Sequence, residues 1–238
     1  MISAFSYNIH KGFDAGNLNY VLTDMKTALH SISPDLVFLQ EVIGEDTKSG
    51  REPQFASLAQ ELWPNQAYGK NLIHDLGHHG NAILSKFPIL SSQNFELSGN
   101  RFEKRGLLHA QVKAPETVHL FSTHLSLLHR DRKKQVSEVI DFIKKAVPVY
   151  EPCILAGDFN DWNRKLDFIF EREGFTEVFK SIHGESAKTF PSLFPILTLD
   201  RIFTRGFLVQ AAHCHTGQPW NHLSDHVALS AYLEFEVL

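Results

Sequence analysis

The chain has 238 residues, of which 43% are hydrophobic and 21% charged, and its formal net charge is −4 at pH 7. These values are typical of a globular protein with a sizeable core and exclude a disordered or fibrous chain. Proteins that grip long nucleic acids usually carry a basic surface, so the negative charge weighs against a processive or nonspecific DNA-binding protein.

The predicted elements follow from short apolar runs, which indicate strands, and from 3.6-residue periodicity, which indicates helices. In chain order we expect a strand at 2–9, a helix at 18–31, a strand at 35–42, a helix at 53–62, strands at 66–73, 80–87, 107–114 and 117–125, a helix at 131–147, and strands at 152–159, 197–204 and 226–235. Strict alternation of strand and helix is missing, which makes a doubly wound parallel sheet the less favoured fold. A four-layer αββα sandwich, with two sheets face to face and helices outside, fits this order best.

No linker, repeat or low-complexity tract interrupts the sequence, so we expect one domain over residues 1–238. Neither a signal-peptide pattern nor a membrane-spanning apolar run is evident. Cys153 and Cys214 lie in apolar segments and fit neither a disulfide framework nor a metal-binding spacing. We therefore expect a cytoplasmic monomer without a membrane span.

Polar side chains that carry chemistry recur at the ends of the predicted strands. They are Asn8, Glu41, His124, Asp158, Asn160, Asp200, Asp225 and His226. If these strand ends share one rim, the carboxylates repel one another strongly unless a cation neutralises them. Hard oxygen ligands favour Mg²⁺, with Mn²⁺ as a possible substitute, over Zn²⁺.

Each motif alone also has a structural explanation. The segment "GDFND" (157–161) is often a strand followed by an Asx turn, and "SDH" (224–226) is usually a cap. A lone Glu41 or His124 at a strand end is more often solvated than catalytic. The occurrence of all these motifs together in one chain is what favours a functional site.

The motifs "YNIHKG", "LQEV", "GNAILSKFPI", "STHL", "AGDFND", "LDRIF" and "LSDHVALSAYL" resemble, in this order, those of the endonuclease/exonuclease/phosphatase superfamily, which has the fold of DNase I. The resemblance runs from about Ser6 to Leu233, and is greatest to small bacterial members that share "HKGF" and "AGDFNDW". It implies an αββα sandwich and a metal-dependent phosphodiesterase or phosphomonoesterase.

The resemblance also implies a metal site and an acid–base pair. Glu41 would be the principal Mg²⁺ ligand, and Asn8 and Asp225 would complete the site directly or through water. Asp200 and His226 resemble the carboxylate–imidazole pair of the family. The carboxylate would fix the tautomer of the ring, which would then hold or deprotonate the attacking water.

The remaining roles concern the phosphoryl group. Asp158 would align the attacking water, and Asn160 would donate a hydrogen bond to a non-bridging oxygen. His124 would bind the phosphate and, as an imidazolium, help to protonate the leaving group. Arg105 matches a family arginine that contacts phosphate, although a surface or sheet-edge position explains it equally well.

One departure from the family concerns the partner of His124. DNase I-like members orient this histidine with a glutamate on a neighbouring strand, but the corresponding stretch here reads "HHGNAILSK". Asn81 or His79 would have to substitute, which would leave His124 less basic. His79 and Asn81 are also candidate substrate contacts, although adjacent loop histidines are more often solvated.

The sequence leaves the substrate open among three alternatives. A small or lipid-derived phosphate ester is favoured by the acidic charge balance and by apolar side chains that could line a pocket, namely Phe190, Leu193, Phe194, Ile196, Trp162 and Trp220. A nuclease or DNA-repair phosphodiesterase would use the basic segment "HRDRKK" (129–134), which more often forms a solvated helix face. A scaffold without turnover ranks last, because the catalytic side chains are all present.

Overall fold

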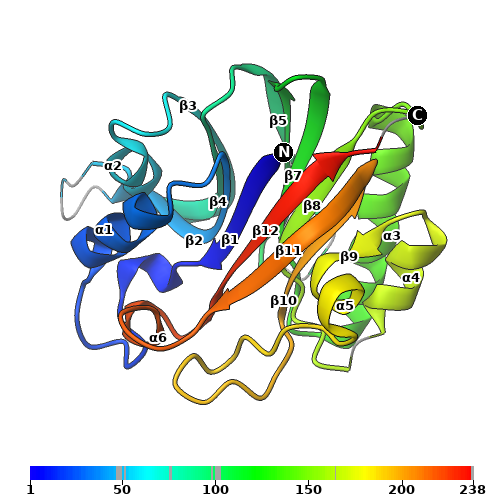
Figure 1. Cartoon of the computed structure of the whole chain (residues 1–238). Coiled ribbons are helices and arrows are strands. Elements are labelled where there is room, and N and C mark those ends of the chain that lie inside the picture. The colour runs from blue at the N-terminus through cyan, green and yellow to red at the C-terminus, as the bar shows by residue number, and fades with distance from the viewer. Residues whose placement is uncertain are drawn as a thin grey trace.

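The computed structural model describes residues 1–46, 50, 52–74, 77–97, 99, 103–163 and 165–236. In this part of the chain, two six-stranded sheets pack face to face, and helices cover their outer faces (Figure 1). The core between the sheets is apolar and mostly aliphatic, and it includes Phe38, Ile83, Leu120 and Ile154. The predicted αββα sandwich is therefore confirmed.

The first sheet joins the two ends of the chain. Its strand order is β11 (Phe207–His215), β12 (Ala228–Phe235), β1 (Ile2–Asn8), β2 (Leu36–Asp46), β4 (Gly77–Ser85) and β3 (Asn65–His74). Side chains alternate between its faces, so that Ala4 packs between the sheets and Phe5 packs outward. The outer face is covered by α1 (Leu22–Ile32), α2 (Gln54–Ala59) and α6 (Trp220–Leu223).

The second sheet is built from the middle of the chain. Its strand order is β5 (Ile89–Leu97), β6 (Arg105–Lys113), β7 (Thr117–His124), β8 (Cys153–Asp158), β10 (Asp200–Arg205) and β9 (Thr176–Glu177). Its outer face packs against α3 (His129–Ala146) and α4 (Leu166–Arg172). The short helix α5 (Val178–His183) contributes Val178 and Phe179 to the core between the sheets.

The predicted elements are present and differ mainly at their ends, but the structure adds elements that were not predicted, among them β11, α4 and α5. Helix 18–31 begins only at Leu22, helix 53–62 shortens to α2, and helix 131–147 becomes α3. Strand 197–204 begins at Asp200, because Leu197 pairs with Phe190 in the preceding loop. Strand β5 was not predicted, since its residues are mostly exposed and give no alternating apolar pattern.

Strand direction explains why the predicted site residues meet. β1 and β2 run parallel, as do β7 and β8, so each pair has its carboxyl ends at one edge. β12 runs antiparallel to β1, and β10 antiparallel to β8, so their amino ends reach the same edge. The register places His124 beside Asp158, and Asp158 beside Asp200. None of the helices in the described ranges is long and apolar enough to cross a membrane.

Candidate active site

The floor of the candidate site consists of Asp158, Asp200 and His226, which are all buried. Nδ1 of His226 lies 2.9 Å from Oδ2 of Asp200, and its Nε2 lies 3.8 Å from Oδ2 of Asp158. Among the described residues, these are the only three His, Cys, Asp or Glu side chains whose potential ligand atoms lie within 4.8 Å of one another. The structure thus forms the predicted carboxylate–imidazole pair and adds a second carboxylate to it.

The charges of this floor are balanced internally. Burial, opposed by His226 and reinforced by Asp200, raises the pKa of Asp158 to about 6. Burial alone would lower the pKa of His226, but the carboxylates of Asp200 and Asp158 outweigh it and raise this pKa to about 10. His226 is therefore an imidazolium at neutral pH, and its positive charge offsets the negative charges of Asp158 and Asp200.

Asp158 is the centre of a hydrogen-bond network that gathers further predicted residues. Its Oδ2 accepts a hydrogen bond from Nδ2 of Asn8 at 3.2 Å and lies 3.3 Å from Nε2 of His124. Its Oδ1 accepts the backbone N–H of Asn160 at 2.9 Å, which holds Asn160 at φ 50°. The side-chain amide of Asn160 donates to the carbonyl of Leu125 at 2.9 Å, so one of its two N–H groups is left for a ligand.

His124 is less basic than its predicted role requires. Burial and the nearby charge of Arg105 outweigh the opposing charge of Glu41 and hold the pKa of His124 well below its usual range. The lowered pKa favours the neutral ring, which can exchange hydrogen bonds with a phosphoryl oxygen. This direction agrees with the weaker basicity expected from the missing glutamate partner.

The two residues proposed to orient His124 occupy different positions. Asn81, on β4, donates its side-chain amide to the backbone carbonyls of Gly106 and Ser122 at 3.2 and 3.3 Å, so it links the sheets. Its N–H groups are thus directed to the backbone instead of to His124. His79 is half-buried, and its charge contributes to the lowered pKa of His124, which places it near the site.

The rim of the site carries Glu41 and Asp225, each facing a basic residue. Nζ of Lys11 lies 2.9 Å from Oε2 of Glu41, and Nδ1 of His10 lies 3.7 Å from Oδ1 of Asp225. Burial alone would raise the pKa of Glu41, but the neighbouring His124 ring, together with the charge and hydrogen bond of Lys11, outweighs burial and lowers this pKa to about 2. Sequence reasoning missed His10 and Lys11, although they lie two and three residues after Asn8 in the motif "YNIHKG".

Arg105 lies at the opposite flank, at the start of β6. Its Nη2 donates to Oε1 of Glu103 at 2.6 Å, and Oε2 of Glu103 accepts the hydroxyl of Ser126 at 2.5 Å. The Arg105 charge acts on both His124 and Asp158, which places it within reach of the site. Glu103, which anchors Arg105, was not predicted.

The basic segment 129–134 is only partly the solvated face that was expected. Lys133 and Lys134 are exposed, but Arg132 is 2% exposed. Its Nη1 donates to the carbonyls of Ser126 and Leu127 at 2.9 and 3.0 Å. Arg132 therefore braces the segment that follows His124, instead of facing solvent.

The apolar pocket expected near the site is also only partly present. Trp220 is buried against Phe5 and Tyr7 in the layer outside the first sheet, because α6 packs there. Phe190 packs on the His226 ring, with ring centroids 5.1 Å apart. The other apolar side chains of this loop, which are Leu193, Phe194 and Ile196, are exposed to solvent. Trp162 is exposed as well.

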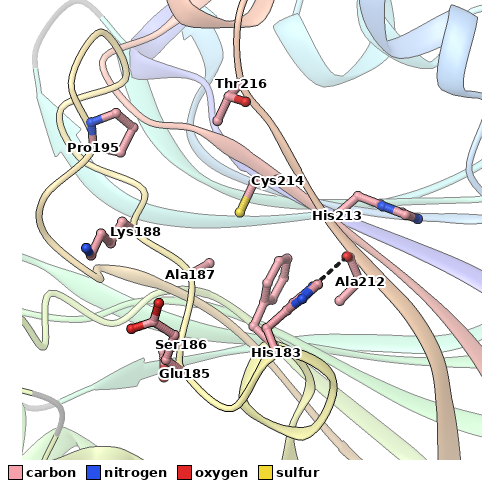
Figure 2. A pocket seen from close by; sticks show the side chains of 11 residues that line it. His183, Glu185, Ser186, Ala187, Lys188, Pro195, Ala212, His213, Cys214 and Thr216 are labelled. Atoms are coloured by element: carbon pink, nitrogen blue, oxygen red, sulfur yellow. Dashed lines mark hydrogen bonds between the residues drawn. The ribbon is translucent and has the colours of Figure 1, made fainter.

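A separate pocket of about 590 Å³ lies between the loop after α5 and strand β11 (Figure 2). Side chains around it include His183, Lys188, His213 and Cys214 (Figure 2). None of the predicted site residues lines this pocket. His183 is engaged with the backbone carbonyl of Ala212 at 3.0 Å, and among the described residues that line the pocket Glu185 is the only one with a carboxylate side chain.

The residues of the rim and floor fit a hard divalent cation. Apart from the His226 ring, which already lies against Asp200 and Asp158, their donors are carboxylate and amide oxygens, which suit Mg²⁺ or Mn²⁺. Oδ1 of Asp200 is buried without a hydrogen-bond partner, so a polar atom remains to be satisfied. Glu41 and Asp225, at the rim, could take a cation without disturbing the hydrogen bond between Oδ2 of Asp200 and His226.

Comparison with known proteins places this arrangement in a family. The model of the Endonuclease/Exonuclease/phosphatase family matches residues 5–226. The chain belongs to this family. Members of the family hydrolyse phosphoric esters, so the protein is a phosphoric ester hydrolase. An Escherichia coli (strain K12) relative, "Uncharacterized protein YbhP", is 38% identical over 94% of this chain and 92% of its own.

Solved structures share the fold at lower identity. D. rerio TDP2 complexed with single strand DNA product superposes with a TM-score of 0.74 at 20% identity, covering 98% of each chain. The mannosyl-6-phosphatase Bt3783 of Bacteroides thetaiotaomicron VPI-5482 superposes with a TM-score of 0.73 at 17% identity, covering 99% of this chain and all of its own (100%). Similarity at this level establishes the shared fold and leaves the substrate to be argued from the site.

Proposed function

We propose that the protein hydrolyses a phosphomonoester or phosphodiester by Mg²⁺-assisted in-line attack of water, and that its substrate is a small or lipid-derived phosphate ester. The observation that carries this proposal is the convergence on Asp158. Four polar side chains from four separate segments, those of Asn8, His124, Asp200 and His226, meet around this one buried carboxylate. Turn chemistry alone does not require such a convergence, since a turn needs only local partners.

Glu41, Asn8 and Asp225 are the residues we assign to the metal. The floor of Asp158, Asp200 and His226 already contains its own cation, whereas the rim carboxylates face Lys11, whose side chain is 41% exposed, and His10, whose side chain is 19% exposed. When bound, the ion would neutralise charge that develops on the phosphoryl and leaving oxygens. Mn²⁺ should substitute for Mg²⁺, because both prefer oxygen ligands.

The buried residues would position water and phosphate. Asp158 accepts hydrogen bonds from the side chain of Asn8 and the backbone N–H of Asn160, and it would orient the attacking water with its remaining lone pairs. Asp200 holds one nitrogen of the His226 ring, so the other nitrogen is directed toward Asp158 and the reacting groups. The free N–H of Asn160, the ring of His124 and the guanidinium of Arg105 would bind non-bridging oxygens. His79 and Asn81 would support this flank.

The preference for a small or lipid-derived ester rests on the surroundings of the floor. The loop that carries Phe190 is tied to the site because the N–H of Ser192 donates to the carbonyl of Asp225 at 2.8 Å. Its tip exposes Leu193, Phe194 and Ile196, which suits contact with an apolar part of a substrate. The phosphatase Bt3783, named for mannosyl-6-phosphate chemistry, shares the fold.

A nucleic acid substrate is the second candidate, favoured by the likeness to TDP2 with its single strand DNA product. The net charge of −4 weighs against it, because phosphate neutralisation dominates nucleic acid affinity. We further propose that the chain is one domain that acts as a monomer in the cytoplasm. All assigned site residues come from one chain, and both cysteines are free thiols.

An activity panel with Mg²⁺ and Mn²⁺ tests the proposal. The substrates are p-nitrophenyl phosphate, bis-p-nitrophenyl phosphate, phospholipids, phosphoinositides, nucleotides, RNA, abasic duplex and plasmid DNA. We expect metal-dependent hydrolysis of small or lipid esters, and its collapse in Asp158→Ala and His226→Ala proteins that keep their circular dichroism spectrum. Nicking of DNA at low protein concentration would instead support the nuclease, and unchanged turnover in both variants would refute the site assignment.

A further inference from the structure

The turn that follows β1 holds its backbone in an unfavourable conformation. His10, Lys11 and Gly12 have φ values of 46°, 55° and 82°, and only the glycine adopts this region readily. The turn is fixed from outside: Nε2 of Gln54, which is 2% exposed, donates to the carbonyl of Lys11 at 2.7 Å. Such strain persists only where the surrounding structure enforces it, and it is concentrated at functional sites.

The consequence of this turn is to direct two basic side chains into the rim. Lys11 lies against Glu41 and His10 lies toward Asp225, so each of the two carboxylates assigned to the metal faces one residue of the turn. The Lys11 side chain is 41% exposed and that of Glu41 is 20% exposed, so the ammonium lies at the open side of the site. Asp158 and Asp200, by contrast, are almost completely buried beneath.

Fold stability does not account for this arrangement. An ion pair with a half-exposed lysine contributes little to folding, because solvent screens it and two long side chains lose freedom. Two consecutive non-glycine residues in the left-handed region work against folding. The strained backbone holds the Lys11 ammonium beside the proposed phosphate site, which suggests that a negatively charged ligand binds to this ammonium.

We propose that Lys11 is a phosphate-binding residue that favours monoesters over diesters, an inference that rests on the proposed function. In the metal-free protein Glu41 holds the Lys11 ammonium at the rim. A divalent cation that takes over Glu41 frees this ammonium to bind non-bridging oxygens of the substrate. Lysine binds phosphate as a point charge. A monoester dianion carries one more negative charge than a diester, so it gains more from Lys11.

Metal binding provides the first test, and it needs no turnover. The metal-free protein is titrated with Mn²⁺, and free Mn²⁺ is followed by electron paramagnetic resonance in wild type, Lys11→Met and Lys11→Arg. We expect Lys11→Met to bind Mn²⁺ several-fold more tightly, because the competing ammonium is gone. Weaker binding would show that Lys11 only orients Glu41, and unchanged binding would show that it does not occupy the site; either result overturns the proposal.

Phosphate binding and kinetics provide the second test. With saturating Mn²⁺, we expect Lys11→Met to weaken the binding of inorganic phosphate about tenfold, the effect of losing one charge-assisted hydrogen bond. The KM for p-nitrophenyl phosphate should rise by a similar factor, that for bis-p-nitrophenyl phosphate should rise less, and Lys11→Arg should restore part of both. The matched control is Lys144→Met. It removes a lysine on α3 that also pairs with a glutamate, at 2.6 Å, and it should leave all of these values unchanged.

The two levels of the hypothesis fail differently. If wild type hydrolyses esters while Lys11→Met keeps its phosphate affinity and its monoester KM, the role of Lys11 is refuted and the proposed function stands. If wild type hydrolyses none of the esters, the proposed function fails, and phosphate binding by Lys11→Met still decides the role of Lys11. Absence of phosphate binding by metal-loaded wild type refutes that role outright.

Discussion

The charge state of His226 gives a sharp prediction, because one neighbour controls it. In the variant Asp200→Asn the side chain keeps its shape but loses the negative charge that lies 2.9 Å from Nδ1 of His226. Burial then still disfavours the imidazolium of His226, and only the carboxylates of Asp158 and Asp225 still stabilise it. We therefore expect the pKa of His226 to fall steeply in this variant.

The size of the fall follows from the geometry. The rise from 6.5 to about 10 in the wild type corresponds to on the order of 5 kcal/mol in favour of the imidazolium. Coulomb attraction between unit charges 2.9 Å apart is roughly 6 kcal/mol at an effective dielectric constant of about 20, so Asp200 alone is large enough to offset burial. Removal of its charge should lower the pKa of His226 by about 2 units or more.

A histidine NMR titration of the metal-free protein measures this directly, with His226 assigned by the signal that disappears in His226→Gln. Asp141→Asn, which removes an exposed carboxylate on α3, is the control and should leave the titration unchanged. We also expect kcat/KM of Asp200→Asn to fall by about 10²- to 10⁴-fold, the usual effect of losing acid–base positioning. If His226 still titrates near pH 10 in Asp200→Asn, the electrostatic account of the floor is wrong.

Three further predictions concern stability and the scaffold. Gly157→Ala should lower the free energy of unfolding by about 2–4 kcal/mol and inactivate the enzyme. Gly157 has a φ of 150°, and a Cβ there would lie 1.9 Å from the carbonyl oxygen of Thr123 and separate β7 from β8. Chemical denaturation measures the loss, and a stable, active variant would contradict this prediction. Burial and the adjacent His119 lower the pKa of His109 to about 4. The folded state therefore takes up a proton at His109 only at a lower pH than the unfolded state does. The free energy of unfolding should fall by about 3 kcal/mol as the pH drops from 6.5 to 4. His109→Gln should flatten this part of the stability profile, and an unchanged slope would refute the assignment. Asp167→Asn should cost about 3–5 kcal/mol in a thermal or denaturant melt, since it leaves the buried guanidinium of Arg201 without its carboxylate at 3.1 Å; a loss below about 1 kcal/mol would mean that Arg201 finds other partners.

The layers of the fold were predictable because most strands read as apolar runs with clear boundaries. The missed elements lack that signal. β5 is largely exposed, and β11 is an edge strand whose polar residues interrupt its apolar pattern. Trp220 was misplaced because an aromatic residue in a loop-like segment reads the same whether it lines a pocket or packs into a core.

The site shows a similar division between what local pattern reveals and what it does not. In "GDFND", Asp158 belongs to the floor, whereas Asp161 serves the turn and accepts the N–H of Leu166 at 2.9 Å. The sequence alone could not separate these two aspartates, since both follow the same strand. Lys11 and Glu103 were missed because their roles depend on partners 30 and 23 residues away in the chain.

The central claim is that a hard divalent cation binds at Glu41 and Asp225, above the buried floor. A crystal structure of the protein soaked with Mn²⁺, with the ion located by its anomalous scattering, tests it most directly. We expect a peak roughly 2.0–2.3 Å from a carboxylate oxygen of Glu41, with the hydrogen bond between Asp200 and His226 intact. A peak bound only by Asp158, Asp200 and His226, or no peak near Glu41 at saturating Mn²⁺, would contradict the account.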